Sequence, residues 1–553
     1  MAAAFVEAGV ERAFTVPGES FLPLLDALVE ARVRVIATRH EGGASFMAEA
    51  TGKLTGRPAL CMGTRAVGTA NLAIGIHTAR QDSTPMIVVS GQVARQFRGR
   101  EAFQEVELAE TFGGLAKWAR ELHHPERVHD LLREGLREMV SGRPGPVLYS
   151  VPEDLFSELA PDTGPDAGAS VGALATVPEP STEAVEAVLD LLRGARRPAI
   201  LTGSGVPRAA ATQELVAFAE RLSLPVFAAW RRQDSFPNDH PLFLGLTGYG
   251  AAPTVKPRLL EADALLVLGC RLNEITTFDY AIPGEKTRWA HVDLEPRTAH
   301  AGLRAPDLAL PVDAGAFLRA ALAQAETGGN AAPQDRDELN RADRAAYEAA
   351  SVIDDIPWDG PGVHPGRVIT CLQRVLPPEA ILTTDAGNFG SWTARGYRFR
   401  QHGTFLGPTS GAMGYSLPAG IAASLARPGT PVVSLAGDGG FAMTMQELET
   451  AVREGASPVA IVFDNRRYGT IAMYQQREGR PGIATELGPI DFVKVAEACG
   501  AGGTYVDSDE VFEPALRAAL ASGRPHVIHL QLDPAWVSPD HPPGIPRTDG
   551  SAQ

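Results

Sequence analysis

The chain has 553 residues, a length typical of about three or four domains of roughly 150 residues each. Hydrophobic residues make up 44% of it and charged residues 21%, as in soluble globular proteins, and no apolar run approaches the roughly 20 residues that span a bilayer. The net charge of −16 argues against a nucleic-acid-binding protein. Composition therefore favours a multidomain protein with neither a membrane nor a nucleic acid as partner.

The cysteines and the first residues indicate a reducing compartment. Cys61, Cys270, Cys371 and Cys499 lie far apart and form no CxxC pair, so neither a zinc site nor a disulfide framework is expected. The start of the chain lacks the basic segment and continuous apolar core of a secretion signal. We expect a cytoplasmic protein with reduced thiols.

Strand-like and helix-like segments alternate along the chain in three blocks. We expect α/β domains at 1–156, 180–325 and 345–537, with a linker rich in Pro, Gly, Ala and Asp from 157 to 181. Short apolar runs such as ILTTD, PVVSLAG, VAIVFDN and HVIHLQL are typical of strands buried in parallel sheets. The alternation predicts a doubly wound parallel sheet in each block.

A glutamate in the first block stands at the predicted start of a helix. Glu41 follows the apolar run VRVIA, and the helix is expected to begin near Gly43. A carboxylate at a helix start is favourable by about 0.3–1 kcal/mol, so a purely structural role is one interpretation of Glu41. Its position after a strand also makes it a candidate for the active site.

A glycine-flanked aspartate follows an apolar run in the last block. Gly437 and Asp438 end one β-branched run, and Asn465 ends the next, 27 positions after Asp438. Asp438 and Asn465 are therefore expected at the carboxyl ends of neighbouring strands, with a helix between them. Gly439 and Gly440 would let a diphosphate approach the backbone at the helix start, where Mg²⁺ bridges phosphate and protein oxygens.

These motifs resemble the signature of thiamine diphosphate (ThDP) enzymes, and nearly the whole chain is similar to the acetolactate synthase large-subunit group. The resemblance implies a pyrimidine-binding first domain, a Rossmann-like central domain and a diphosphate-binding third domain. It implies that Asp438 and Asn465 bind Mg²⁺ through side chains, and Arg467 through its main-chain carbonyl. Because the two cofactor domains come from different subunits in this family, a homodimer or homotetramer is expected.

The resemblance also assigns the cofactor and catalytic residues. Glu41 would hydrogen-bond the pyrimidine ring of ThDP. Met413 would support the bent cofactor and Gly411 would receive the aminopyrimidine, although a methionine at this spacing is often only part of a core. Gly387 and Asn388 match a second diphosphate-binding turn, in which the family often has Gln-His where this chain has Asn-Phe.

Substrate residues are indicated less specifically. Phe103 and Gln104 look like the synthase stretch that faces the reacting centre, with Gln104 as a second catalytic residue, although a solvated loop is the alternative. His77 could point at the site from a helix or be structural. All three belong to the first domain.

The acceptor end departs from the synthases. Ile275 occupies the place of the arginine that holds the second keto acid, so an ordinary acetolactate synthesis is disfavoured. Arg231 or Arg232 could receive an anionic substrate instead, or both could lie in a solvated loop. Flavin adenine dinucleotide (FAD), on a turn at Gly203 and Gly205, is possible but disfavoured because such turns are common in α/β folds.

The sequence thus predicts a ThDP- and Mg²⁺-dependent 2-oxo acid decarboxylase or carboligase, with a pyruvate-like donor and a non-standard acceptor. The alternative is a ThDP-dependent C–C lyase or acyltransferase, of the sulfoacetaldehyde or cyclic-diketone type. A second alternative is a silent homologue that only binds the cofactor.

Overall fold

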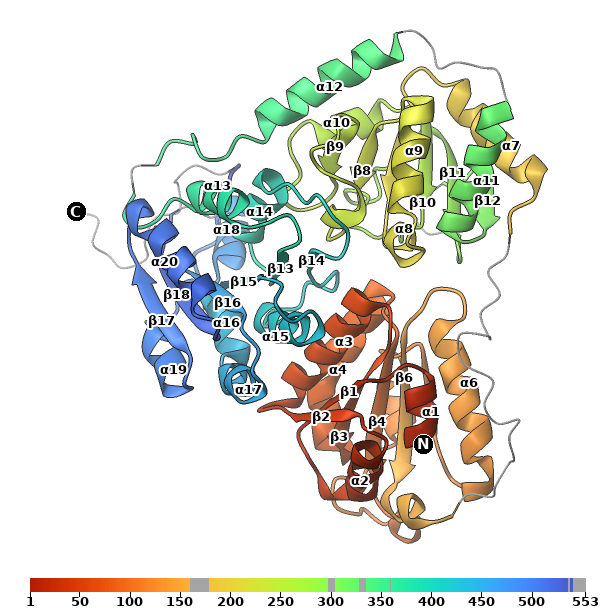
Figure 1. The fold of residues 1–553 in the computed structure, drawn as a ribbon, viewed down its shortest axis with the longest axis vertical. Helices are drawn as coiled ribbons and strands as arrows, with labels where there is room; N and C mark the ends of the chain where they lie inside the picture. Colours follow the sequence, from red (N-terminus) through yellow and green to blue (C-terminus); the bar gives the residue numbers. More distant parts are fainter. Residues whose placement is uncertain (160–178, 297–303, 328–334, 359, 536–537, 541–553) are drawn as a thin grey trace.

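The computed structural model contains three parallel six-stranded sheets, each flanked by helices (Figure 1). It describes residues 1–159, 179–296, 304–327, 335–358, 360–535 and 538–540. Most of the predicted linker lies outside the described residues. The three sheets confirm the predicted α/β fold class. Among the described residues, no helix is long and apolar enough to cross a bilayer.

The first sheet has the strand order β2-β1-β3-β4-β6-β5. Its strands are β1 (Arg12–Thr15), β2 (Arg34–Ala37), β3 (Ala59–Thr64), β4 (Met86–Gln92), β5 (Trp118–Glu121) and β6 (Pro146–Pro152). Its helices are α1 (Ala2–Glu7), α2 (Leu22–Glu30), α3 (Glu41–Thr55), α4 (Arg65–Asp82), α5 (Leu108–Gly113) and α6 (Val128–Val140). The order reverses beside β1, which places α3 and α4 at the crevice where ligands of such sheets bind.

The second sheet has the order β12-β11-β10-β7-β8-β9. Its strands are β7 (Ala199–Thr202), β8 (Val226–Ala228), β9 (Phe243–Leu246), β10 (Ala264–Leu268), β11 (Arg288–Asp293) and β12 (Leu308–Pro311). Its helices are α7 (Thr182–Arg193), α8 (Gly205–Arg208), α9 (Thr212–Leu222), α10 (Val255–Leu260) and α11 (Ala314–Thr327). The separate helix α12 (Arg336–Ala350) runs from this domain towards the third (Figure 1).

The third sheet has the order β14-β13-β15-β16-β18-β17. Its strands are β13 (Ile381–Thr384), β14 (Phe405–Leu406), β15 (Val432–Gly437), β16 (Val459–Asp464), β17 (Gly502–Val506) and β18 (His526–Gln531). Its helices are α13 (Pro365–Val375), α14 (Gly390–Gly396), α15 (Ser416–Ala426), α16 (Asp438–Thr444), α17 (Glu447–Glu454), α18 (Gly469–Arg477), α19 (Phe492–Ala498) and α20 (Asp509–Ala521).

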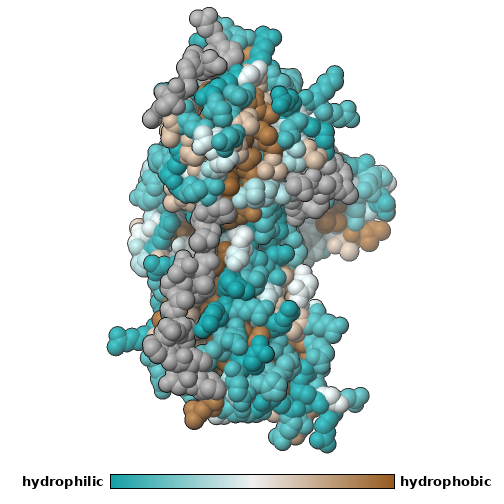
Figure 2. Space-filling view, turned by 90° about the vertical axis from the view of Figure 1, so that its right-hand side faces the viewer, coloured by the Kyte–Doolittle hydropathy of each residue, from teal (hydrophilic) through white to brown (hydrophobic). Residues whose placement is uncertain are grey.

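The first and third domains share one hydrophobic core. Buried side chains of α3 and α15 belong to a single cluster, in which the rings of Phe46 and Tyr415 meet edge to face at 5.4 Å. The face shown in Figure 2 is mostly hydrophilic, with hydrophobic residues gathered in smaller patches. Burial of apolar surface therefore fixes the helix that begins at Glu41 against the third domain.

Candidate active site

Three turns at the carboxyl ends of adjacent strands form the floor of the site. They follow β13, β15 and β16, which pair in parallel in that order. The turns contain residues 385–388, 437–440 and 465–468. Asp438 and Asn465 therefore lie at the ends of neighbouring strands, as the spacing predicts.

Two glycines in the middle turn are required by close packing. A Cβ on Gly439 would lie 2.7 Å from a ring carbon of Tyr468, and a Cβ on Gly440 would collide with the Asp385 carboxylate. No side chain fits at either position, so the backbone N–H groups at the start of α16 stay open to the cavity.

One cavity of about 280 Å³ brings together most of the predicted cofactor residues. Its lining includes Gly387, Asn388, Gly411, Met413, Gly437, Asp438, Gly439, Gly440, Asn465 and Arg467. Residues that the sequence did not single out complete it, among them Pro365, Trp392, Phe463, Tyr468 and Ile471. The cavity thus has a glycine-rich polar end and an apolar end.

The donor atoms near Asp438 suit a hard cation that also has phosphate ligands. Burial, and then the neighbouring Asp464, raise the pKa of the Asp438 carboxyl to about 7, which a bound cation would reverse. Asn465 Oδ1 accepts from Arg467 N at 3.2 Å, and the Arg467 carbonyl accepts from Gly469 N at 2.8 Å. No group of three or more His, Cys, Asp or Glu side chains that could hold a metal occurs among the described residues. One carboxylate, one amide and one carbonyl leave about half of a Mg²⁺ shell to phosphate and water.

Asp385 connects its own turn to the segment at Gly414 and Tyr415 and packs beside the middle turn. Its carboxylate accepts from Gly414 N at 2.8 Å, from Ala386 N at 2.9 Å and from Tyr415 N at 3.3 Å, beside Gly440. Burial raises the pKa of the Asp385 carboxyl to about 6, although these hydrogen bonds lower it. An aspartate after a strand is too common for the sequence to single it out.

Glu41 is the first residue of α3 and does not line the diphosphate cavity. Asn71 Nδ2 donates to Glu41 Oε2 at 2.9 Å, and a Cβ on Gly68 would approach Oε1 to 3.3 Å. Oε2 is therefore held by a hydrogen bond, whereas Oε1 accepts none from the described residues. Within one chain, the structure does not place Glu41 in the cavity that contains Asp438.

The backbone before Glu41 is anchored to the third domain. The buried Glu447, at the start of α17, accepts from His40 N at 3.0 Å and from Arg39 N at 3.2 Å. Thr450 donates to the same carboxylate at 2.7 Å. This anchor fixes the entry to α3, and no sequence motif indicated it.

The other first-domain candidates lie on α4 or contact its first residues. Gln104 has a left-handed backbone (φ 62°), and its carbonyl accepts from Ala66 N at 3.3 Å. Its side-chain Oε1 is buried and has no partner in the part of the chain that the structure describes. Phe103 is 72% exposed and lies under the Arg65 guanidinium. His77 is half-buried in the middle of α4. None of Phe103, Gln104 and His77 lines the diphosphate cavity.

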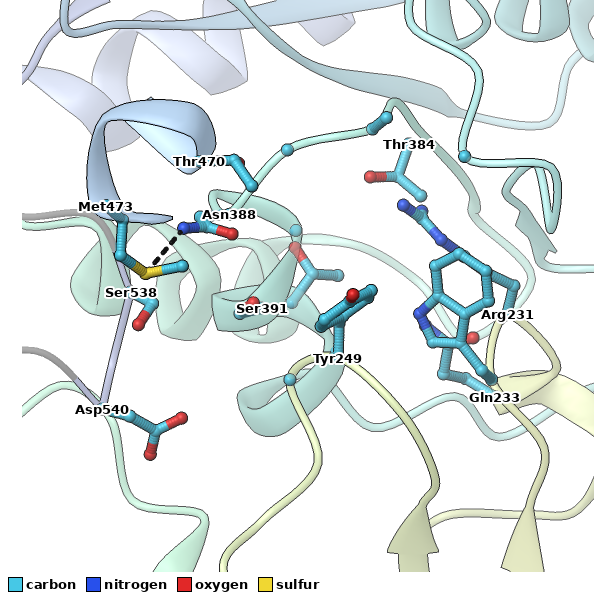
Figure 3. A pocket seen from close by; sticks show the side chains of 18 of the residues that line it. Arg231, Gln233, Tyr249, Thr384, Asn388, Ser391, Thr470, Met473, Ser538 and Asp540 are labelled. Atoms are coloured by element: carbon cyan, nitrogen blue, oxygen red, sulfur yellow. Dashed lines mark hydrogen bonds between the residues drawn. The ribbon is translucent and has the colours of Figure 1, made fainter. Parts of the chain in front are cut away.

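A second cavity, of about 290 Å³, adjoins the first between the central and third domains (Figure 3). The two cavities share Ala386, Gly387, Asn388, Gly411 and Thr470. In the second cavity, Asn388 donates to Met473 Sδ at 3.4 Å, and Tyr474 of α18 donates to Tyr249 of the central domain at 3.3 Å.

The two adjacent arginines have different environments. Arg231 lines the second cavity, and its guanidinium points towards Thr384 and donates to the Asp385 carbonyl at 2.9 Å (Figure 3). Arg232 instead donates to Asp82 at 2.6 Å, in a buried ion pair between the central and first domains. The solvated-loop interpretation is therefore wrong for both, since both side chains are buried.

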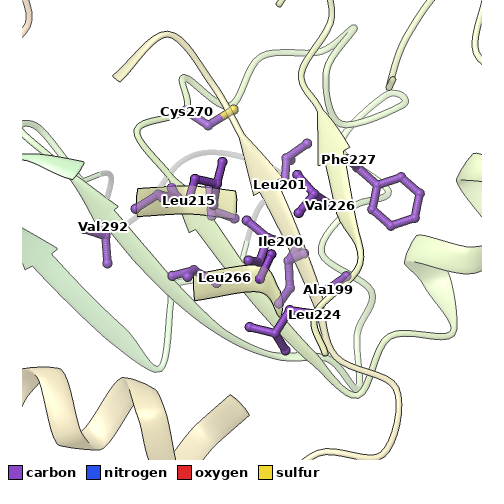
Figure 4. Packing of buried hydrophobic residues seen from close by; sticks show 14 of the residues in the cluster. Ala199, Ile200, Leu201, Leu215, Leu224, Val226, Phe227, Leu266, Cys270 and Val292 are labelled. Atoms are coloured by element: carbon purple, nitrogen blue, oxygen red, sulfur yellow. The ribbon is translucent and has the colours of Figure 1, made fainter. Parts of the chain in front are cut away.

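The glycines of the candidate flavin turn are packed closely against a neighbouring backbone segment. A Cβ on Gly203 would lie 2.5 Å from Cys270 Cα, and one on Gly205 would lie 2.5 Å from Gly269 Cα. Figure 4 shows Cys270 among the buried hydrophobic residues of the central domain. The strand-end Asp293 pairs with Arg143 of the first domain at 2.8 Å. These glycines are explained without a flavin, and the fit to FAD is poor.

Comparison with known proteins matches all three domains. Models described as thiamine pyrophosphate enzyme N-terminal TPP binding domain, central domain and C-terminal TPP binding domain match residues 1–111, 185–321 and 385–530. The chain is 31% identical to a probable acetolactate synthase large subunit of Methanocaldococcus jannaschii, covering 97% of this chain and 92% of that protein. It is 33% identical to a sulfoacetaldehyde acetyltransferase of Rhodobacter capsulatus, over 93% and 90%. It is 29% identical to the acetolactate synthase isozyme 2 large subunit of Escherichia coli, over 98% and 96%.

Proposed function

The chain belongs to the ThDP-dependent enzymes of the acetolactate synthase-like family, and from that premise we propose that it is a Mg²⁺-dependent 2-oxo acid decarboxylase and carboligase. The observation that carries the proposal is the single cavity in which Asp438, Asn465 and Met413 meet two glycine-rich turns. The donor is a pyruvate-like 2-oxo acid, and the acceptor differs from that of acetolactate synthases.

The residues of the diphosphate cavity have separate tasks in this proposal. ThDP, when bound, supplies the electron sink for decarboxylation. Asp438 and Asn465 hold Mg²⁺ through side-chain oxygens, and Arg467 holds it through its carbonyl, which keeps one lone pair free of the Gly469 hydrogen bond. The side chain of Arg467 points elsewhere, because it pairs with Glu486 at 2.6 Å.

Glu41 acts from the neighbouring subunit of a homodimer or homotetramer. Asn71 fixes Oε2 of its carboxylate, so that Oε1 would be the atom available to exchange a proton with the pyrimidine of a bound ThDP. Support comes from the position of Glu41 outside its own chain's cavity and from exposed apolar side chains around both parts. On the Glu41 side these are Val67, Ile74 and Phe103, and on the diphosphate side Met443 and Ile471.

The second candidate is a ThDP-dependent acyltransferase or C–C lyase. One relative is named for acetyl transfer to or from sulfoacetaldehyde, an aldehyde with a sulfonate group. Ile275, which is half-buried against the central core, offers no charge to a keto acid, whereas Arg231 offers one from the adjacent loop. These observations favour an anionic substrate other than the second keto acid of acetolactate synthesis.

The test is release of CO₂ from a panel of 2-oxo acids, with products identified by mass spectrometry. We expect release to require both ThDP and Mg²⁺, and Asp438→Asn to weaken cofactor binding, measured by calorimetry, because a buried charged ligand of the metal is lost. Acyl transfer or C–C cleavage without CO₂ release would favour the second candidate. Binding of ThDP and Mg²⁺ without turnover of any substrate would indicate a silent homologue.

A further inference from the structure

The second cavity contains three polar side chains with buried atoms that have no hydrogen-bond partner among the described residues. They are Arg231 at Nε, Gln233 at Oε1 and Thr393 at Oγ1. Arg231 comes from the central domain after β8, Gln233 from the same loop, and Thr393 from α14 of the third domain. Buried polar atoms in proteins nearly always have partners, so three of them around one cavity indicate a polar ligand.

Arg231 indicates that this ligand carries a negative charge. The residue is only 8% exposed, and among the described residues its guanidinium has no ion-pair partner and one hydrogen-bond acceptor, the Asp385 carbonyl. The Asp385 carboxylate is nearby but is engaged with three backbone N–H groups. A guanidinium has five N–H donors, and leaving a buried charge unpaired is unfavourable.

The local backbone fixes the position of this cation. Arg231 has φ 61°, a left-handed conformation that residues with side chains rarely adopt and that clusters at functional sites. The ring of Trp230 lies 5.2 Å from the guanidinium carbon, so a cation–π contact also holds it. Arg232, the next residue, is paired with Asp82 and is not available.

We propose that Arg231, with Gln233 and Thr393, binds the carboxylate or sulfonate of an anionic acceptor substrate in the second cavity. That the bound anion is the acceptor substrate rests on the proposed function. It places the anion next to Ala386, Gly387 and Asn388, which line both cavities, so the carbonyl of the same small molecule reaches the cofactor side.

Anion binding is tested without turnover, on enzyme loaded with ThDP and Mg²⁺. Fluorine NMR follows trifluoroacetate (a carboxylate), trifluoromethanesulfonate (a sulfonate) and neutral trifluoroacetamide. We expect at least one anion, and not the amide, to bind, and Arg231→Gln to weaken it about ten- to hundredfold. Arg517→Gln is the matched control, because Arg517 is 57% exposed on α20 and pairs only with Glu513 among the described residues.

Substrate preference is then measured as a ratio of kcat/KM values, which a general loss of active enzyme does not change. The kcat/KM for glyoxylate and for sulfoacetaldehyde is divided by that for neutral glycolaldehyde. In Arg231→Gln we expect this ratio to fall at least tenfold, with cofactor affinity and donor CO₂ release retained and Arg231→Lys intermediate.

Each of three results would overturn the inference. Wild type and Arg231→Gln could bind the anion equally, the neutral amide could bind as well as the anions, or Arg231→Gln could lose ThDP affinity instead of anion binding. Wild type that binds the anion through Arg231 but releases no CO₂ from any 2-oxo acid would instead overturn the proposed function. The two failures are therefore distinguishable.

Discussion

The two adjoining cavities are built from different parts of the chain. The polar end of the diphosphate cavity includes glycines such as Gly439 and Gly440, whose replacement would cause collisions. The part of the second cavity that lies in the central domain is instead lined by the side chains of Arg231, Gln233 and Tyr249. We therefore expect substrate differences in this family to arise at side chains such as those of the second cavity rather than at the glycines of the first.

The largest effect is expected from Glu41, which should alter turnover without altering either cavity. Glu41→Gln keeps the size of the side chain but replaces the titratable carboxyl with an amide that cannot act as an acid or base, so turnover should fall about 10²- to 10⁴-fold. ThDP and Mg²⁺ affinity, measured by calorimetry, should change little. An unchanged turnover would show that Glu41 is only a helix-start residue.

Mixing two inactive variants tests which subunit supplies Glu41. If Glu41 and Asp438 of one site come from different chains, a mixture of Glu41→Gln and Asp438→Asn subunits after reassociation contains dimers with one intact site. About a quarter of wild-type activity is then expected. No recovery of activity would place both residues of a site in the same chain.

Replacement of Asp82 should show that its partner Arg232 has a structural role. Burial alone would raise the pKa of the Asp82 carboxyl, but Lys53 and Arg232 lower it below its ordinary value. Thr409 of the third domain also donates to it, at 2.7 Å, so Asp82 joins three domains. Asp82→Asn should destabilise the protein by about 3–5 kcal/mol, because two buried cations lose their partner.

Thermal unfolding measures this loss, and its pH dependence has a definite sign. Because the pKa of Asp82 is lower in the folded chain, the stability that it contributes is present above its unfolded pKa and is lost as the pH falls below about 4. Asp82→Asn should lack that part of the acid dependence. A variant as stable as wild type would mean that Arg232 does not depend on Asp82.

Asp385 precedes Ala386, which lines both cavities, and should give a smaller effect of opposite sign. Its pKa rises from 3.8 to about 6 in the folded chain, so the folded state binds the proton more tightly. Stability from this group should therefore fall by about 3 kcal/mol as the pH rises from about 4 to about 6. In the cofactor-free protein, Asp385→Asn should remove this decline from the midpoint of thermal unfolding. The same decline in both proteins would assign it to another group.

The fold and the diphosphate cavity could be predicted because their signals are local. Strands such as β15 and β16 are short apolar runs, and the glycines and Asp438 follow them directly in the chain. The roles of Arg231 and Arg232 could not be separated, because the partner of Arg232 is Asp82, 150 residues away. Asp385 and Glu447 were missed for the same reason: each acts through backbone N–H groups of distant segments, which leave no pattern in the sequence.

The hydrogen bonds of Glu447 link helix α16 of the third domain to the backbone before Glu41 in the first domain. Helix α16 starts at Asp438, and α17 follows it and starts at Glu447. The Glu447 carboxylate accepts a hydrogen bond from the backbone N–H of His40, immediately before Glu41. In the proposed dimer, Asp438 and Glu41 of one chain serve opposite active centres. A small shift of α16 on phosphate binding at one centre would then be passed on, through the short connection to Glu447, to the backbone that precedes Glu41 at the other centre.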